Sequence, residues 1–95
     1  MKHFYVYIMA SIKKTIYIGM TNNLERRVNE HKSGTADSFT KKYNITKLVY
    51  YFELDSSNEA ISLEKKLKGI TREKKLQLIE ENNPYWKDLS VTSVE

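Results

Sequence analysis

The sequence contains no cysteine, only three glycines and only two histidines. Without cysteine, neither a disulfide framework nor a zinc site built on thiolates is possible, and this composition fits a reducing compartment. Three scattered glycines do not make a glycine-rich phosphate-binding loop. Two distant histidines without the HExxH spacing argue against a catalytic zinc. These absences exclude several common kinds of enzyme site.

The chain also lacks long apolar segments. No run approaches the roughly 20 consecutive apolar residues that a membrane-spanning helix requires, and the first residues show no signal-peptide pattern. We therefore expect a cytoplasmic protein. With 95 residues, 40% hydrophobic and 29% charged, the chain suits one globular domain, which we expect to span residues 1–95.

The charge of the chain is moderately positive, with a formal net charge of +4. Such a balance favours a polyanionic partner such as nucleic acid, although only mildly. A dense basic run follows residue 64. Runs of this kind are usually a solvated helix face, but beside tyrosine and arginine they also suit phosphates. Its members are Lys65, Lys66, Lys68, Arg72, Lys74 and Lys75.

Two segments near the start of the chain predict a β-hairpin. Residues 3–10 and 15–20 are rich in β-branched and aromatic residues, and residues 11–14 supply a polar turn. Alternation along the strands predicts one apolar face, formed by Val6, Ile8, Ile16 and Ile18. If Tyr7 lies opposite Tyr17, the other face carries Tyr5, Tyr7, Tyr17 and Gly19.

The remaining segments predict a third strand and three helices. Asn22 followed by Glu25 resembles a capping box and predicts a helix to about Lys32. Residues 35–46 are polar and loop-like, with Phe39 and Tyr43 as anchors. Residues 48–54 predict a strand. Ser56 or Ser57 would cap a second helix that runs to about Gly69, and Thr71 would cap a third helix that runs to about Glu81. Asn82-Asn83-Pro84 would stop that helix, Trp86 and Leu89 would return to the core, and the last five residues would fray. The expected fold is a small α+β domain with a three-stranded antiparallel sheet and about three helices.

Helical geometry distinguishes two adjacent arginines. At about 100° per residue, Leu24, Val28 and His31 lie on one arc with Arg27 at its edge, while Arg26 points roughly the opposite way. Arg27 is therefore the arginine expected near the sheet. The simpler alternative is that Arg27 only covers the edge of the core with its aliphatic stem and that His31 is a boundary residue.

Glu64 is the glutamate whose predicted position most needs an explanation. It falls inside the apolar arc of the second long helix, which Ala60, Ile61, Leu63, Leu67 and Ile70 would form. A buried carboxylate must be paired, protonated or bound to a cation, because a bare buried charge is very costly. The simpler alternative is a Glu64–Lys68 pair at the edge of the helix, worth a few tenths of a kcal/mol.

Taken together, these residues resemble the GIY-YIG nuclease family. The match is most similar to its small stand-alone bacterial branch, close to the N-terminal catalytic domain of the excision-repair nuclease, excinuclease ABC. It covers roughly residues 3–89, and the order and spacing of the motifs carry it. The motifs are Tyr5-Val6-Tyr7, Tyr17-Ile18-Gly19, the helix signature from Gly19 through Arg27 to His31, the acidic helix segment Glu59-Ala60 with Glu64-Lys65 and Lys68, and Asn83-Pro84.

The resemblance implies a metal-dependent DNA endonuclease. Its biological role could lie in DNA repair or recombination. It implies that Tyr7 and Tyr17 frame the scissile phosphate and that one of them, by preference Tyr17, orients or deprotonates the attacking water. Arg27 would stabilise charge on the phosphoryl oxygens. The remaining implied roles are proton transfer or phosphate contact for His31, a single Mg²⁺ or Mn²⁺ at Glu64, and a steadying role for Asn83.

Two positions depart from the family pattern. Tyr5 stands where the first motif has its glycine, and Met20 follows the second motif where excision-repair relatives often place a basic residue. These departures, together with the basic surface, keep open a nucleic-acid-binding module with weak or no cleavage. A basic structural or partner-binding protein is a third alternative. Because a domain of this size has little surface for reading a long site, targeting would need a protein partner or a dimer.

Overall fold

The computed structural model describes residues 3–90 as three strands and four helices. The elements are β1 (Phe4–Ala10), β2 (Ile16–Thr21), α1 (Leu24–Ser33), α2 (Ser38–Lys42), β3 (Lys47–Leu54), α3 (Ser57–Gly69) and α4 (Arg72–Asn82). The predicted α+β class and three-stranded sheet are confirmed, and α2 is an additional helix inside the segment expected to be a loop. No helix within the described range is long and apolar enough to cross a membrane. The expected fraying concerns the last five residues, which lie outside this range.

The sheet is antiparallel, with β1 between β2 and β3. The pairing of Tyr7 with Tyr17, on which the expected tyrosine face was conditional, does not form. Tyr7 lies opposite Gly19 and Tyr17 opposite Met9, a register that differs by two residues. A shift of two residues preserves the face to which each side chain points. The predicted faces of the hairpin are therefore correct in the observed register.

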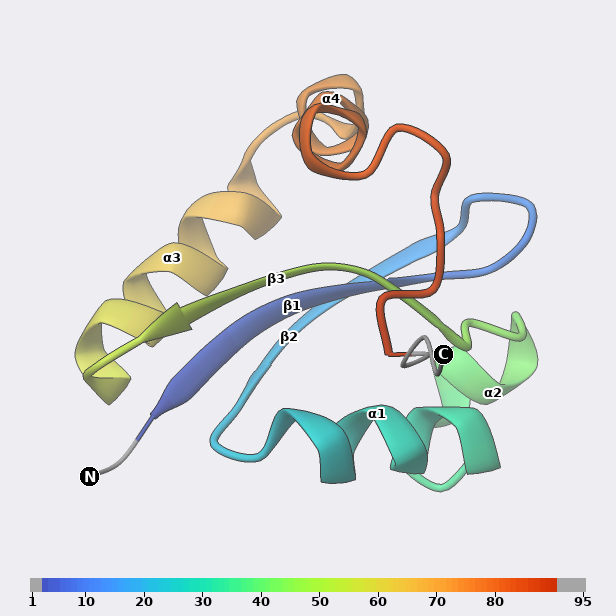
Figure 1. The fold of residues 1–95 in the computed structure, drawn as a ribbon, viewed down its shortest axis with the longest axis horizontal. Coiled ribbons are helices and arrows are strands. Elements are labelled where there is room, and N and C mark those ends of the chain that lie inside the picture. Colours follow the sequence, from blue (N-terminus) through green and yellow to red (C-terminus); the bar gives the residue numbers. More distant parts are fainter. Residues whose placement is uncertain (1–2, 91–95) are drawn as a thin grey trace, which may run out of the picture.

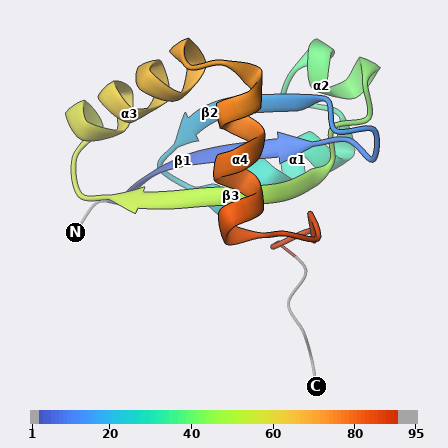
Figure 2. The same ribbon diagram turned by 90° about the horizontal axis from the view of Figure 1, so that it is seen from above.

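Helices cover both faces of this sheet. Figure 1 shows α3 and α4 on one side of the strands and α1 with α2 on the other, and Figure 2 shows α4 crossing the sheet while α3 runs beside β2. Each face has its own apolar cluster. On the α3 and α4 side it contains Val6, Ile8, Ala10, Ile18, Val49, Ala60, Leu67, Ile79 and Trp86. On the α1 side it contains Tyr7, Met9, Val28, Ile45 and Leu48.

Local capping explains where the helices begin. The α1 cap is Asn23 rather than the predicted Asn22, because the Asn23 side chain accepts a hydrogen bond from the Arg26 backbone N–H at 3.1 Å. Gly34 ends α1 with a positive φ of 81°. Ser56 and Thr71 cap α3 and α4, as predicted.

The missed helix α2 has the same kind of start. The Asp37 side chain accepts a hydrogen bond from the Phe39 backbone N–H at 2.7 Å. At five residues, α2 is too short to show the apolar periodicity that would predict a helix. Phe39 and Tyr43, expected to anchor this segment, contact each other in a tilted arrangement with ring centroids 4.8 Å apart, yet each stays 43% exposed.

Asn83 fixes the chain after α4 to the sheet. Its side-chain amide donates to the backbone carbonyls of Val49 at 3.2 Å and Lys87 at 2.8 Å, and its oxygen accepts from the Lys87 backbone N–H at 3.0 Å. Trp86 is buried beyond it, as predicted, whereas the Leu89 side chain stays 43% exposed and only its backbone N–H binds the sheet, at Leu48. The amide of Asn83 thus serves three backbone groups at a position that is only 5% exposed.

These contacts predict a large difference between two neighbouring asparagines. Asn83→Ala removes three hydrogen bonds and leaves buried backbone groups without these partners. We therefore expect it to lower the free energy of unfolding by about 2 kcal/mol. Asn82→Ala is the matched control, because the exposed Asn82 amide donates to the Leu78 carbonyl of its own helix and not to the sheet in the part of the chain that the structure describes. Urea unfolding of both variants checks the prediction, and equal midpoints would contradict it.

Candidate active site

The hairpin places two phenols on the face that α1 covers. Tyr7 of β1 is 2% exposed, and Tyr17 of β2 is half-buried beside it, with ring centroids 6.4 Å apart. Gly19 makes room for the first phenol, since a Cβ at this position would lie 2.6 Å from the Tyr7 hydroxyl oxygen. No larger residue fits there without moving Tyr7. This contact gives a physical reason for the glycine that ends the second motif.

Helix α1 brings an imidazole to the same place. His31 lies one turn after Arg27 and is 2% exposed. The Tyr7 hydroxyl lies 3.0 Å from His31 Nε2, in a buried hydrogen bond. The imidazole ring is also close to both phenol rings, with centroids 5.6 Å from Tyr7 and 5.2 Å from Tyr17. Three of the predicted site residues therefore form one cluster.

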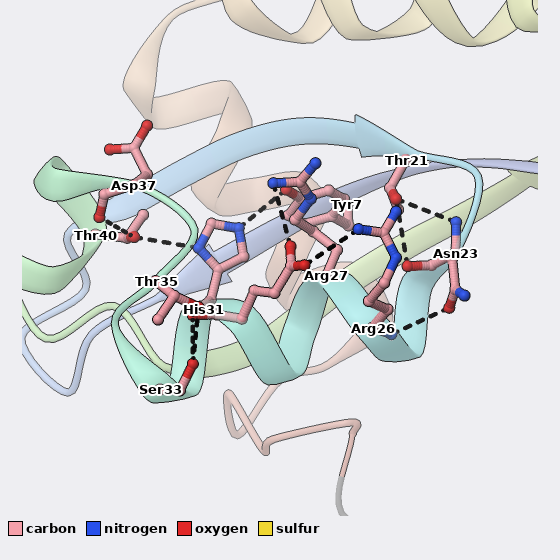
Figure 3. Close-up of polar contacts among 11 residues, drawn as sticks. Tyr7, Thr21, Asn23, Arg26, Arg27, His31, Ser33, Thr35, Asp37 and Thr40 are labelled. Atoms are coloured by element: carbon pink, nitrogen blue, oxygen red, sulfur yellow. Dashed lines mark hydrogen bonds and ion pairs between the residues drawn. The ribbon is translucent and has the colours of Figure 1, made fainter.

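Two residues that the sequence did not single out complete this cluster. Figure 3 shows Thr40 on the far side of the His31 ring from Tyr7, with Asp37 behind it. The Thr40 hydroxyl lies 3.2 Å from His31 Nδ1 and donates to the Asp37 backbone carbonyl at 2.9 Å. Thr40 has no exposed surface. The signal that could have indicated α2, the helix of Thr40, is Asp37, a residue type favoured at helix N-caps, three positions before Thr40.

Burial controls the protonation of the cluster. It raises the pKa of Tyr7 well above its usual range, with the neighbouring Tyr17 adding to the effect and Arg27 opposing it. The pKa of Tyr17 is raised first by burial and then by Asp37. Burial, followed by the positive charge of Arg27, lowers the pKa of His31. At neutral pH both phenols therefore keep their protons and the imidazole is uncharged.

The two arginines contact the same carboxylate but differ in burial. Both guanidinium groups contact Glu30, with Nη1 of Arg26 at 3.1 Å from one carboxylate oxygen and Nη1 of Arg27 at 3.5 Å from the other. The Arg26 side chain is 51% exposed and that of Arg27 is 33% exposed. Nε of Arg27 is buried and has no hydrogen-bond partner within the part of the chain that the structure describes. Arg27 is therefore the arginine whose donors are directed into the protein.

Glu64 approaches the phenols from α3. Its side chain is 20% exposed and forms the helix pair considered above, with Lys68 Nζ 3.2 Å from Oε2. Its negative charge contributes to the raised pKa of both Tyr7 and Tyr17, which places it within electrostatic range of the cluster. Residues 3–90 hold no group of three or more His, Cys, Asp or Glu side chains arranged for a metal.

A single carboxylate is nevertheless compatible with Mg²⁺. This ion keeps several of its waters and is often held by one or two carboxylates together with substrate phosphates. The ammonium group of Lys68 shows that the Glu64 carboxylate already accommodates a cation. The donor set therefore fits a weakly held, largely hydrated divalent ion better than a closed protein cage.

The other predicted positions lie apart from the cluster. Within residues 3–90, the side-chain hydrogen bonds of Asn83 all go to backbone groups, and none joins it to the phenols, Arg27 or His31. Met20 packs on the α3 and α4 side of the sheet, so a basic residue at this position would start from the face opposite the phenols. Tyr5 points to the α1 side but pairs with Thr21, one step beyond the Tyr7–Gly19 pair.

Comparisons with known proteins agree with this architecture. Residues 3–77 match the family described as the GIY-YIG catalytic domain. The UPF0213 protein CPE1444 of Clostridium perfringens is 41% identical over 75 residues, which cover 79% of this chain and 81% of that protein. The UPF0213 protein HQ_3675A of Haloquadratum walsbyi is 40% identical over 77 residues, or 81% of this chain and 86% of that protein.

A solved structure shows the same fold. The solution NMR structure of the UPF0213 protein BH0048 from Bacillus halodurans is 30% identical, with a TM-score of 0.59, and the match covers 95% of this chain and 99% of that one. The family match spans most of the chain, from the strand of Tyr7 through the helix of Glu64. The chain therefore belongs to the GIY-YIG family of nuclease domains.

Proposed function

We propose that this protein is a metal-dependent endonuclease that hydrolyses phosphodiester bonds in DNA, using Mg²⁺ or Mn²⁺. The observation that carries the proposal is the buried hydrogen bond between the Tyr7 hydroxyl and His31 Nε2, which lies within electrostatic reach of Arg27. A phenol, an uncharged imidazole and a guanidinium supply the three things that phosphodiester hydrolysis needs from side chains. These are an orienting group, a proton acceptor and a positive charge.

Arg27 is the proposed ligand of the phosphoryl oxygens. A buried N–H without a partner costs about 1–3 kcal/mol, and an incoming acceptor relieves this cost. Nε of Arg27 is such a group, and its guanidinium presents further donors in a planar fork that matches phosphate. Its present partner, Glu30, holds it by a partly exposed pair at 3.5 Å, which a phosphate can displace at little cost.

The proton lost by the attacking water needs a destination. We assign it to His31 Nε2, with Tyr7 as the intermediate. As the water oxygen forms its bond to phosphorus, its proton moves to the Tyr7 oxygen while the Tyr7 proton moves to Nε2. The bond from phosphorus to the leaving nucleoside oxygen breaks, that oxygen takes a proton from solvent, and the imidazolium later returns one to solvent. Tyr17, whose raised pKa keeps it a neutral phenol, would orient the water.

Glu64 would hold the metal, after its carboxylate exchanges Lys68 for the ion. When bound there, a divalent cation supplies positive charge for the phosphoryl oxygens and the leaving group. A targeting partner or a dimer, and a role in DNA repair or recombination, complete the proposal. The small size of the domain and its resemblance to the excision-repair nuclease support these last two points.

Matched pairs of variants test the proposal in a plasmid-nicking assay with Mg²⁺ or Mn²⁺. Arg27→Ala and Glu64→Gln should each lower the nicking rate by roughly 10²–10³-fold, because each removes charge stabilisation in the transition state. Arg26→Ala and Glu59→Gln should cut at near the wild-type rate, since these neighbours are exposed side chains of the same two helices. EDTA should abolish cutting by every active variant.

The same assay, combined with a DNA-binding titration, separates the alternatives. If the wild-type protein binds DNA but cuts it no faster than Arg27→Ala does, the protein is a nucleic-acid-binding module. In that case the Glu64–Lys68 ion pair is a structural contact and not a metal site at rest. Protein that binds no nucleic acid at any salt concentration would overturn both, in favour of a structural or partner-binding role.

The lowered pKa of His31 predicts a pH dependence. His31 is surrounded by Arg27 and Glu30 of its own helix, Asp37 beside α2, and the two phenols of the hairpin. Because only the uncharged ring accepts a proton, nicking should increase as the pH rises through the His31 pKa, below the usual value of about 6.5, and then level off. A loss of activity as His31 becomes uncharged would contradict the assignment.

The sign of the stability change follows from the same shift. The folded state holds His31 uncharged, so its contribution to stability is present above the unfolded pKa of about 6.5 and is lost as the pH falls through the lower folded pKa. NMR titration of the His31 ring checks this prediction. A His31 midpoint at or above that of a model peptide would contradict it.

A further inference from the structure

The hydroxyl of Thr40 limits the protonation states open to His31. Three contacts run in a line: the Asp37 carbonyl to the Thr40 hydroxyl, Thr40 to His31 Nδ1, and His31 Nε2 to the Tyr7 hydroxyl. The two contacts of the His31 ring are buried, and the contact with the Asp37 carbonyl is partly buried. The line is visible in Figure 3. Each hydroxyl carries one proton, and the carbonyl can only accept. The number of protons therefore decides which arrangement satisfies all three contacts.

With the proton of the uncharged ring on Nδ1, every contact is a hydrogen bond. Thr40 donates to the Asp37 carbonyl, Nδ1–H donates to the Thr40 oxygen, and Tyr7 donates to Nε2. With the ring proton on Nε2, Thr40 must turn its only proton to Nδ1. Its oxygen then faces the Asp37 carbonyl oxygen at 2.9 Å with no proton between them. One contact in three becomes repulsive, so the Nδ1–H tautomer is the more stable one.

When the His31 ring carries both protons, all three contacts are again hydrogen bonds. Nδ1–H still donates to Thr40, and Nε2–H donates to the Tyr7 oxygen. His31 can therefore gain a proton at Nε2 without any movement of Thr40 or Asp37. The Asp37 carbonyl is itself fixed, because it also accepts from the Lys41 backbone N–H at 3.1 Å in α2. The short helix supplies a rigid support for one face of the imidazole.

We propose that Thr40 is a positioning residue, which holds the His31 proton on Nδ1 so that Nε2 faces Tyr7 as an acceptor. The catalytic part of this inference rests on the proposed nuclease function, whereas the tautomer itself does not. Thr40 touches neither substrate nor metal in this role. Its effect passes entirely through the ring of His31.

Nitrogen-15 NMR of the full chain, at a pH above the His31 titration, measures the tautomer directly. In wild type, Nδ1 of His31 should show the chemical shift of a protonated nitrogen and Nε2 that of an unprotonated one. Thr40→Val keeps the shape of the side chain but removes the hydroxyl, so the ring proton should move wholly or partly to Nε2. Thr40→Ser keeps the hydroxyl and should give the wild-type pattern.

Thr35→Val is the matched control, because the Thr35 hydroxyl also bonds a backbone carbonyl, that of Glu30, but lies exposed and away from the ring. It should leave the His31 shifts unchanged, and the His3 shifts should be the same in all four proteins. A His31 ring that carries its proton on Nε2 in wild type would overturn the proposal. So would a folded Thr40→Val protein with the wild-type tautomer.

Nicking rates test whether the positioning of His31 by Thr40 matters for catalysis. Thr40→Val should cut roughly 10–100-fold more slowly, as is typical when an outer partner of an active-site histidine is lost. Its affinity for DNA should be unchanged, and Thr40→Ser should retain most of the activity. If wild type cuts no DNA while the tautomer still changes in Thr40→Val, the proposed function fails and the positioning role of Thr40 stands. If Thr40→Val cuts at the wild-type rate, the catalytic part of the inference fails.

Discussion

The hydrogen bond between the Tyr7 hydroxyl and His31 Nε2 is the interaction on which the site depends. It joins the central strand to α1 beside the apolar cluster on that face of the sheet. A buried phenol and a buried imidazole would each be costly without a partner. Gly19 leaves the space that lets Tyr7 reach its position, and Thr40 occupies the other ring nitrogen of His31. Two strands and two helices thus meet at one proton donor and one acceptor.

The charged groups around this pair are held loosely by comparison. Arg27 rests on Glu30 at i+3, and Glu64 on Lys68 at i+4. Pairs of this kind stabilise a helix by about 0.2–0.5 kcal/mol, so they neutralise the site at rest without resisting exchange. A phosphate would replace Glu30 on the guanidinium, and a divalent cation would replace the ammonium on the carboxylate. In the proposed mechanism, the buried Tyr7–His31 pair transfers the proton, and the two ion pairs exchange one partner for the phosphate or the metal.

The sequence was sufficient for the features that follow from local patterns. Alternation in the hairpin assigned Tyr7 and Tyr17 to one face, and side-chain caps located α3 and α4. It was insufficient where a contact depends on tertiary structure. The register considered from the sequence differs by two residues from the observed one, because alternation has a period of two and cannot distinguish such registers. Thr40 was missed because α2 is too short to show the periodicity that reveals a helix. Asn83 shows that the resemblance to a family motif does not reveal what a side chain contacts. Its amide forms hydrogen bonds with backbone groups.

The most direct test of a single phosphodiester-cleaving site is a crystal structure of the Tyr17→Phe variant with a short DNA and Mn²⁺. Anomalous scattering locates the metal independently of the protein atoms. We expect a manganese peak at the Glu64 carboxylate, Lys68 displaced from it, and a DNA phosphate between that metal and Arg27. DNA bound on another face, with the Glu64–Lys68 pair intact and no metal beside it, would contradict this assignment of the site.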